Sequence, residues 1–264
     1  MRILFIGDVV GRAGRTCLAQ WLPELQVEHD VDITVANGEN AAGGVGATPE
    51  VLDELHGIGV QLITLGNHTW KKRELTTGLD AMEYVVRPAN FAEGVPGRGS
   101  MVHGLADGRK LGIVNLVGRV FMPCVQCPFE VGKRKVEELH RETALILVDF
   151  HAEATAEKIA LGWYLDGLCS AVVGTHTHVQ TADERVLPQG TAYITDVGMS
   201  GGLDSVIGVK RELAIERFLT GIPVRFEAAK EGLGLCAVLI DVDDQTGRAR
   251  SIERIIRTEN KNRP

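Results

Sequence analysis

The fold of this chain is decided by the stretch VVGTHTHV, residues 172–179, in which an apolar run and a glycine are followed by two histidines. Side chains two residues apart lie on the same side of an extended backbone, so His176 and His178 can offer two imidazoles to one place. On its own, His-x-His is equally typical of two histidines at the surface. The rest of the chain decides between these two interpretations.

Four other apolar runs also end at residues of the kind that bind metal ions. In chain order these residues are Asp8, then Glu39 with Asn40, then Asn67 with His68, and finally His151. In open α/β sheets, ligands bind outside the carboxyl ends of the strands. Five strands that end in Asp, Glu, Asn or His therefore predict one shared site. Taken singly, Asp8 could be a helix cap, Asn40 a turn residue and His151 a hydrogen-bonded core histidine.

The composition is that of an ordinary globular protein, with 264 residues, 44% of them apolar and 24% charged. The formal net charge of -7 argues against a broad nucleic-acid-binding face, which needs clustered lysines and arginines. This charge does not exclude a nucleotide bound in a pocket where metal ions supply the positive charge. Because the chain shows no linker, repeat or low-complexity segment, residues 1–264 are predicted to form one domain.

The lack of a recognisable targeting signal and the use of cysteine both favour a cytoplasmic protein. The first apolar run ends at Asp8, too early for a signal peptide, and no stretch approaches the ~20 apolar residues of a membrane span. The five cysteines are an odd, scattered set, which suits a reducing compartment. Cys124 and Cys127 form a lone C-x-x-C and are most simply two loop thiols. We expect a cytoplasmic protein with no membrane contact.

The first half of the chain alternates between strand and helix patterns. Apolar runs at 2–7, 31–36 and 60–65 predict buried strands, and helical spacing separates them at 11–30 and 48–59. This alternation predicts right-handed crossovers and a parallel sheet. Pro23 lies inside the first helical pattern, so a kink or a break is expected there.

The second half predicts a mixed sheet. Asp107-Gly108 between two strand-like runs is a hairpin signal. Further strands are predicted at 144–150, 168–173, 192–195, 224–227, 235–242 and 249–257, with helices at 131–141, 152–165 and 213–219. Residues 198–202 are glycine-rich and are predicted to be a flexible loop near the site. The tail, residues 259–264, is predicted to fray.

The candidate ligands have a recognisable donor chemistry. Asp, Glu, Asn and three His without a thiolate form a borderline-to-hard set that suits first-row ions such as Fe, Mn, Zn or Ni. One carboxylate that bridges two ions lets six or seven residues serve a pair, and such pairs lie ~3.5–4 Å apart in two-metal hydrolases. In that chemistry a bridging hydroxide attacks phosphorus while the ions hold its oxygens.

These motifs carry a resemblance that spans the whole chain. The series Asp8, Gly38-Glu39-Asn40, Gly66-Asn67-His68, His151 and His176-Thr177-His178 resembles the calcineurin-like metallophosphoesterase superfamily. Within it, the series is most similar to the YmdB-like bacterial branch, which is associated with cyclic-nucleotide phosphodiesterase activity. The resemblance implies a four-layer α/β/β/α sandwich around two mixed β-sheets, with the metal site at the carboxyl ends of the strands.

The chain departs from the superfamily at three motifs. Its first motif is Asp-x-His, whereas here Val10 stands where the histidine belongs. Gly-Asp-x-x-Asp is replaced by a motif in which Glu39 would bridge both ions and Asn40 would take the place of the absent histidine. The last motif, Gly-His-x-His, has one inserted residue, Thr175.

By the same matching, the resemblance implies two divalent ions, with iron or manganese preferred over zinc. One ion would be held by Asp8, Glu39, Asn40 and His178. The other would be held by Glu39, Asn67, His151 and His176. His68 would bind no metal and would protonate the leaving oxygen or stabilise the transition state. Asp149 precedes His151 by two residues and either orients its ring or bonds to backbone.

The expected function is metal-dependent hydrolysis of a small-molecule phosphodiester, a 2′,3′- or 3′,5′-cyclic nucleotide. One alternative is a phosphomonoesterase of the 5′-nucleotidase kind. Another is a metal-bearing regulatory or RNA-associated binding protein whose hydrolysis is incidental. His68 beside Asn67 favours an enzyme, because binding alone needs no proton donor. A homo-oligomer is left open by the sequence.

Overall fold

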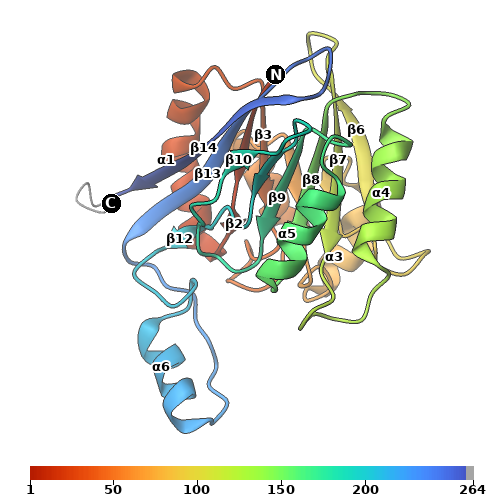
Figure 1. Ribbon diagram of the computed structural model, residues 1–264. Helices are drawn as coiled ribbons and strands as arrows, with labels where there is room; N and C mark the ends of the chain where they lie inside the picture. The colour runs from red at the N-terminus through yellow and green to blue at the C-terminus, as the bar shows by residue number, and fades with distance from the viewer. Residues whose placement is uncertain (260–264) are drawn as a thin grey trace.

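Two mixed β-sheets pack face to face in the computed structural model, which describes residues 1–259 (Figure 1). The first sheet runs in the order β2 (Asp8–Val9), β12 (Met199–Gly202), β13 (Leu233–Val242), β1 (Arg2–Ile6), β3 (Ile33–Asn37), β4 (Leu62–Thr64) and β5 (Val85–Val86), and β14 (Ala249–Thr258) pairs with β13. The second runs in the order β10 (Arg185–Val186), β11 (Ala192–Ile194), β9 (Ala171–Thr175), β8 (Ile146–His151), β7 (Lys110–Val117) and β6 (Ser100–Gly104).

Each sheet has a parallel centre. Strands β1, β3, β4 and β5 run parallel in the first sheet, and β7, β8, β9 and β11 run parallel in the second. Their residues are almost all buried, as expected for parallel strands that are covered on both faces. Antiparallel strands β13, β14, β6 and β10 complete the sheets. The predicted hairpin at Asp107-Gly108 is confirmed between β6 and β7.

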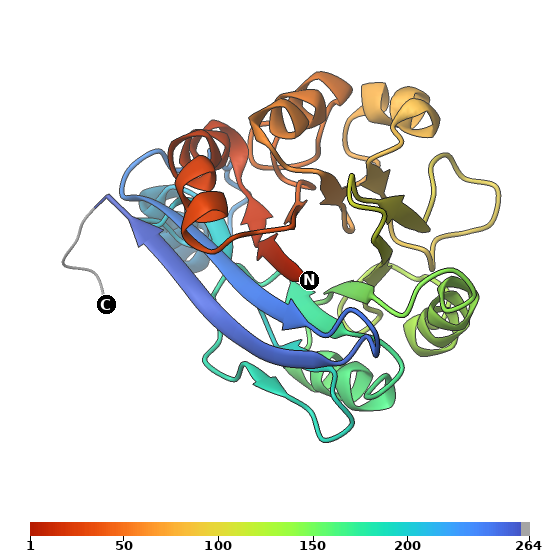
Figure 2. The ribbon, with the colours of Figure 1, turned by 90° about the horizontal axis from the view of Figure 1, so that it is seen from above.

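The helices lie on the outer faces of the sheets, except the last one, which projects from the body (Figure 1). They are α1 (Gly11–Glu28), α2 (Pro49–Ile58), α3 (Arg73–Gly78), the short 3-10 helix η1 (Leu79–Ala81), α4 (Pro128–Leu139), α5 (Thr155–Tyr164) and α6 (Arg211–Thr220). Figure 2 shows α1 and α2 outside the first sheet and α4 and α5 outside the second. This confirms the predicted four-layer α/β/β/α sandwich.

Three apolar clusters hold the layers together. The middle cluster lies between the sheets, where Phe5 and Val35 pack with Leu147 and Val173. A second cluster joins α1 and α2 to the first sheet, and a third joins α4 and α5 to the second. Because apolar side chains fill both faces of each sheet, the polar strand-end residues gather at the rim where the strands stop.

Local sequence signals explain where several elements begin and end. The side chain of Thr48 accepts a hydrogen bond from the backbone N–H of Val51, and Pro49 is the first residue of α2. Gly59 ends that helix in the left-handed region. Pro23 does not break α1, since buried Leu22 and Leu25 pin the helix to the sheet around it.

Two predicted segments differ in the structure. Residues 199–202 of the predicted flexible loop form strand β12, because β2 and β13 satisfy its backbone on both sides. Residues 224–227 form no strand, since they belong to an arm, residues 205–229, that carries α6 away from the body (Figure 1). The predicted frayed tail begins at Glu259, whose N–H donates to Leu233, and residues 260–264 lie outside the described part.

The arm, residues 205–229, buries little of its own surface. Within α6 only Ala214 is buried, whereas Phe218 and Leu219 are 83% and 81% exposed. Across residues 1–259, none of the helices combines the length and the apolar character needed to cross a membrane.

Candidate functional site

All the predicted site residues lie at one rim of the sandwich, where parallel strands of both sheets end. Strand β1 leads to Asp8, β3 to Glu39 and Asn40, β4 to Asn67 and His68, β8 ends at His151, and β9 leads to His176 and His178. The face-to-face packing of the sheets therefore brings together residues that are far apart in the sequence.

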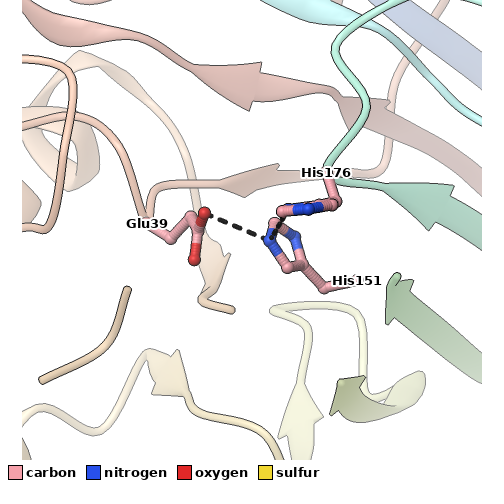
Figure 3. A group of neighbouring side chains, drawn as sticks. All are labelled: Glu39, His151 and His176. Atoms are coloured by element: carbon pink, nitrogen blue, oxygen red, sulfur yellow. Dashed lines mark hydrogen bonds and ion pairs between the residues drawn. The ribbon is translucent and has the colours of Figure 1, made fainter. Parts of the chain in front are cut away.

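Four of these residues converge on one point. Nε2 of His151 lies 3.1 Å from Glu39 Oε1, 3.0 Å from Asn67 Oδ1 and 3.0 Å from His176 Nδ1. Glu39 and His151 are fully buried. Figure 3 shows Glu39, His151 and His176 pointing toward one another from three different strand ends.

A second group lies beside the first and shares Glu39 with it. Asp8 Oδ1 is 3.6 Å from His178 Nε2, and the side-chain nitrogen of Asn40 is 3.4 Å from the same atom. That Asn40 nitrogen donates to Glu39 Oε1 at 3.0 Å. One oxygen of Glu39 thus contacts both groups.

The prediction that His176 and His178 lie on one extended strand is wrong. Strand β9 ends at Thr175, and His176 and His178 have φ angles of 98° and 65°. Both angles lie in the left-handed region, which is uncommon for residues other than glycine. The turned backbone still directs His176 Nδ1 and His178 Nε2 into the site.

The residues present fit a metal ion. Asp8 Oδ1 is buried without a hydrogen-bond partner, which is costly for a carboxylate oxygen unless a cation faces it. His151 Nε2 has three polar atoms within 3.1 Å but carries at most one proton, so it can bond to only one of them. Ligand atoms ~2.1 Å from one first-row ion stand about 3 Å apart, which matches these spacings.

Hydrogen bonds behind the site fix which ring nitrogen of each histidine faces it. His151 Nδ1 lies 2.9 Å from the hydroxyl of Thr175, which donates to Asp149 Oδ1 at 2.7 Å. The predicted orienting role of Asp149 therefore runs through Thr175. On the outer side of His176, Nε2 lies 3.0 Å from Glu153. Such outer bonds leave the opposite nitrogen of each ring facing the interior of the site.

The electrostatics favour the forms of Glu39 and His176 that bind metals. Burial alone would raise the pKa of Glu39, but neighbouring His151 and His68 hold it well below its usual value. Burial and the adjacent His151 lower the pKa of His176 to about 3. Burial acts to lower the pKa of His178, yet Asp8 beside it raises that pKa to about 9. Binding of a cation at His178 would therefore release a proton.

His68 differs from the other site residues in its exposure. Its side chain is 26% exposed, and its Nδ1 lies 2.8 Å from Asn40 Oδ1 and 3.1 Å from Glu39 Oε1. Its backbone N–H donates to Glu39 Oε2. These contacts turn Nδ1 inward, and Nε2 has no hydrogen bond among residues 1–259.

A buried ion pair that the sequence did not reveal holds the His-x-His loop. Lys158 Nζ lies 2.7 Å from Asp196 Oδ2, and both side chains are essentially inaccessible. The same oxygen accepts hydrogen bonds from the backbone N–H and the hydroxyl of Thr177, between the two histidines. Asp196 follows a predicted strand and could have been found as a sixth strand end. Lys158 lies inside a helix, and nothing in the sequence around it indicates that it pairs with a carboxylate.

Loss of the Thr175 hydroxyl should weaken metal binding. In Thr175→Val the shape is kept, but the bond from His151 toward Asp149 is lost, so we expect metal affinity to fall by about 10–100-fold. Competition with a chelator at graded concentrations measures this. Thr34→Val, a buried threonine in β3 outside the cluster, is the matched control and should bind metal as the wild type does. Equal affinities in the two variants would contradict the role of Thr175.

Comparison with known proteins agrees with this geometry. The family model described as YmdB-like protein matches residues 4–255. The chain is 52% identical over 256 residues, 97% of each sequence, to a protein of Bacillus subtilis (strain 168) named 2′,3′-cyclic-nucleotide 2′-phosphodiesterase.

Solved structures are similar over almost the whole chain. A crystal structure described as a novel phosphatase of Mycoplasma pneumoniae has a TM-score of 0.91 and 38% identity, covering 98% of this chain and 93% of that one. The calcineurin-like phosphoesterase YfkN of Bacillus subtilis has a TM-score of 0.62, covering 98% of this chain and 90% of that one. At 14% identity, that second likeness shows the fold alone. The chain therefore belongs to the family of YmdB-like proteins, and its fold is that of the calcineurin-like phosphoesterases.

Proposed function

We propose that the protein is a metal-dependent phosphodiesterase that hydrolyses cyclic nucleotides. The observation that carries this proposal is the cluster of two buried carboxylates, buried His151 and two partly buried histidines at the strand ends, with His68 at its accessible side. The relative named 2′,3′-cyclic-nucleotide 2′-phosphodiesterase, 52% identical over nearly the full length, supports the substrate class.

Two divalent first-row ions would occupy the site, with iron or manganese preferred over zinc. Asp8, Glu39, Asn40 and His178 would hold one ion. Glu39, Asn67, His151 and His176 would hold the other. The contacts of Glu39 Oε1 with both groups support its role as the bridging ligand. Bound ions would supply positive charge to the phosphoryl oxygens and lower the pKa of an attacking water.

His68 would donate a proton to the leaving oxygen. Its contacts to Asn40 and Glu39 fix the ring with Nδ1 inward, which leaves Nε2 for the substrate. The backbone bond from His68 to Glu39 also ties the position of the proton donor to that of the proposed bridging ligand.

A diester suits the charge of this site better than a monoester does. Among the described residues, none of the hydrogen bonds or ion pairs made by the side chains of the eight site residues involves a lysine or an arginine side chain. A monoester dianion favours such cations beyond the metals, whereas two ions alone can balance the single charge of a diester. A monoesterase is the second candidate, because the similar structure from Mycoplasma pneumoniae is described as a phosphatase.

The protein would act in the cytoplasm as a single domain. All five cysteines are free thiols in the described structure, which suits a reducing compartment. The rim site draws ligands from both sheets, so neither sheet would form it alone.

Removal of the bridging carboxylate should empty both metal positions. Glu39→Ala removes the only ligand that the two ions would share, so elemental analysis should find both ions reduced. Asp8→Ala should mainly reduce one. Retention of two ions per chain without Glu39 would show that it does not bridge.

His68→Ala should keep its metal ions and its fold but lose turnover by roughly 10²–10⁴-fold, the usual contribution of a general acid. The loss should shrink for nitrophenolate, a leaving group that needs little protonation. Steady-state rates with good and poor leaving groups measure this. His103→Ala, a partly buried histidine of β6, is the control and should retain wild-type rates. An equal loss with both leaving groups would argue against proton donation.

A substrate panel under one metal condition tests the function itself. Metal-loaded protein should hydrolyse bis(nitrophenyl) phosphate and cyclic nucleotides faster than nitrophenyl phosphate. Monoester turnover well above diester turnover would favour the phosphatase instead. Metal binding without any turnover would favour a regulatory or RNA-associated binding protein.

A further inference from the structure

A pocket adjoins the site at His178. It has a volume of about 400 Å³, and its walls come from β12, β13, β14 and the segments around residues 179 and 205. The apolar members of the lining are Val179, Met199, Leu203, Ile207, Cys236 and Ile256. The lining contains no Asp, Glu, Lys or Arg, so this His178 pocket suits an uncharged group.

His178 belongs to both the pocket and the candidate metal site. Its Nε2 faces Asp8, whereas its Nδ1 donates to the backbone carbonyl of Ile207 at 2.9 Å. A group in the pocket would therefore lie next to whatever the Asp8 group holds. His178 thus joins the pocket to the metal site.

The backbone of Ile207 is strained, and this residue contacts both His178 and the pocket. Its φ angle is 46°, in the left-handed region, where a β-branched residue is an outlier. Strain of this kind persists where the surrounding structure imposes it, and it clusters at functional sites. Here the unusual backbone directs the carbonyl to His178, while the side chain, 52% exposed, forms part of the pocket wall.

The pocket wall has apolar surface open to solvent. Val179 and Ile256 are 61% and 41% exposed although they lie in the wall of a hollow. Gln180, also in the lining, is held in place because its side-chain N–H groups donate to the carbonyls of Val197 and Ala237. Ligand pockets commonly have this character, an apolar lining with a few polar groups that fix orientation.

From these observations we infer that the His178 pocket binds the nucleobase of a nucleotide whose phosphodiester lies at the metal site. The inference rests on the proposed phosphodiesterase function. A nucleobase is flat and uncharged, so it can displace water from the apolar wall. The metal ligands recognise the phosphodiester, and the His178 pocket distinguishes a nucleotide from a cyclic phosphate without a base.

The test compares two cyclic phosphodiesters, one with a nucleobase and one without. They are a 2′,3′-cyclic nucleotide and glycerol 1,2-cyclic phosphate, a cyclic diester without a base. The wild type should have the higher kcat/KM for the nucleotide. Val179→Asp and Ile256→Asp place a carboxylate in the apolar wall at exposed positions, and each should lower the ratio of the two kcat/KM values about tenfold or more, a binding difference of about 1.4 kcal/mol.

A matched control separates the pocket from general effects. Ile222→Asp changes an apolar residue that is 64% exposed on the arm, outside the pocket, and should leave the ratio unchanged. Damage to the metal site would lower both kcat/KM values together, so the ratio is insensitive to it. Metal content, measured for every variant, confirms that the site is intact.

The outcomes distinguish the pocket from the proposed function. If the metal-loaded wild type cleaves both substrates equally well, or if the two pocket variants keep the wild-type ratio, the His178 pocket does not bind the base and the phosphodiesterase assignment stands. If it cleaves neither substrate, the proposed function fails, and the nucleobase assignment fails with it.

Discussion

The arrangement of this protein depends on two carboxylates, Asp8 and Glu39, that are fully buried beside histidines. A buried charge is costly unless opposite charge and hydrogen bonds surround it. Each sheet supplies part of that environment, the first through the two acids and the second through the histidine that ends β8 and the two that follow β9. The two-sheet architecture is thus the means by which acids from the first half of the chain meet histidines from the second.

The location of the site could be predicted from sequence because one rule governs all five strand ends. Parallel strands deliver their carboxyl ends to one rim, so a polar residue after each apolar run identifies the same place five times. Helix boundaries such as Thr48-Pro49 and Gly59 could also be predicted, since capping is a local property. These features depend on neighbours within a few residues.

Features that depend on distant contacts could not be predicted. The segment that became β12 is glycine-rich and has little strand propensity, and it is a strand only because Asp8–Val9 and Leu233–Gly234 pair with it. The Lys158–Asp196 pair and the turned backbone at His176 likewise result from packing across the sandwich. Thr175 departs from the superfamily's spacing in the sequence, yet its hydroxyl joins His151 to Asp149.

The pairing of β1 with β13 has a consequence for how the chain is made. Residues 2–6 lie beside residues 237–241, so the strand that leads to Asp8 lacks this neighbour until most of the chain has left the ribosome. Contacts this distant in sequence form slowly, because the entropy of closing a long loop is lost before the contacts can stabilise the chain. A nascent chain that has just exposed His178 contains every proposed metal ligand but lacks the strand that completes the first sheet. The first sheet around Asp8 is therefore completed only after β13 has been synthesised.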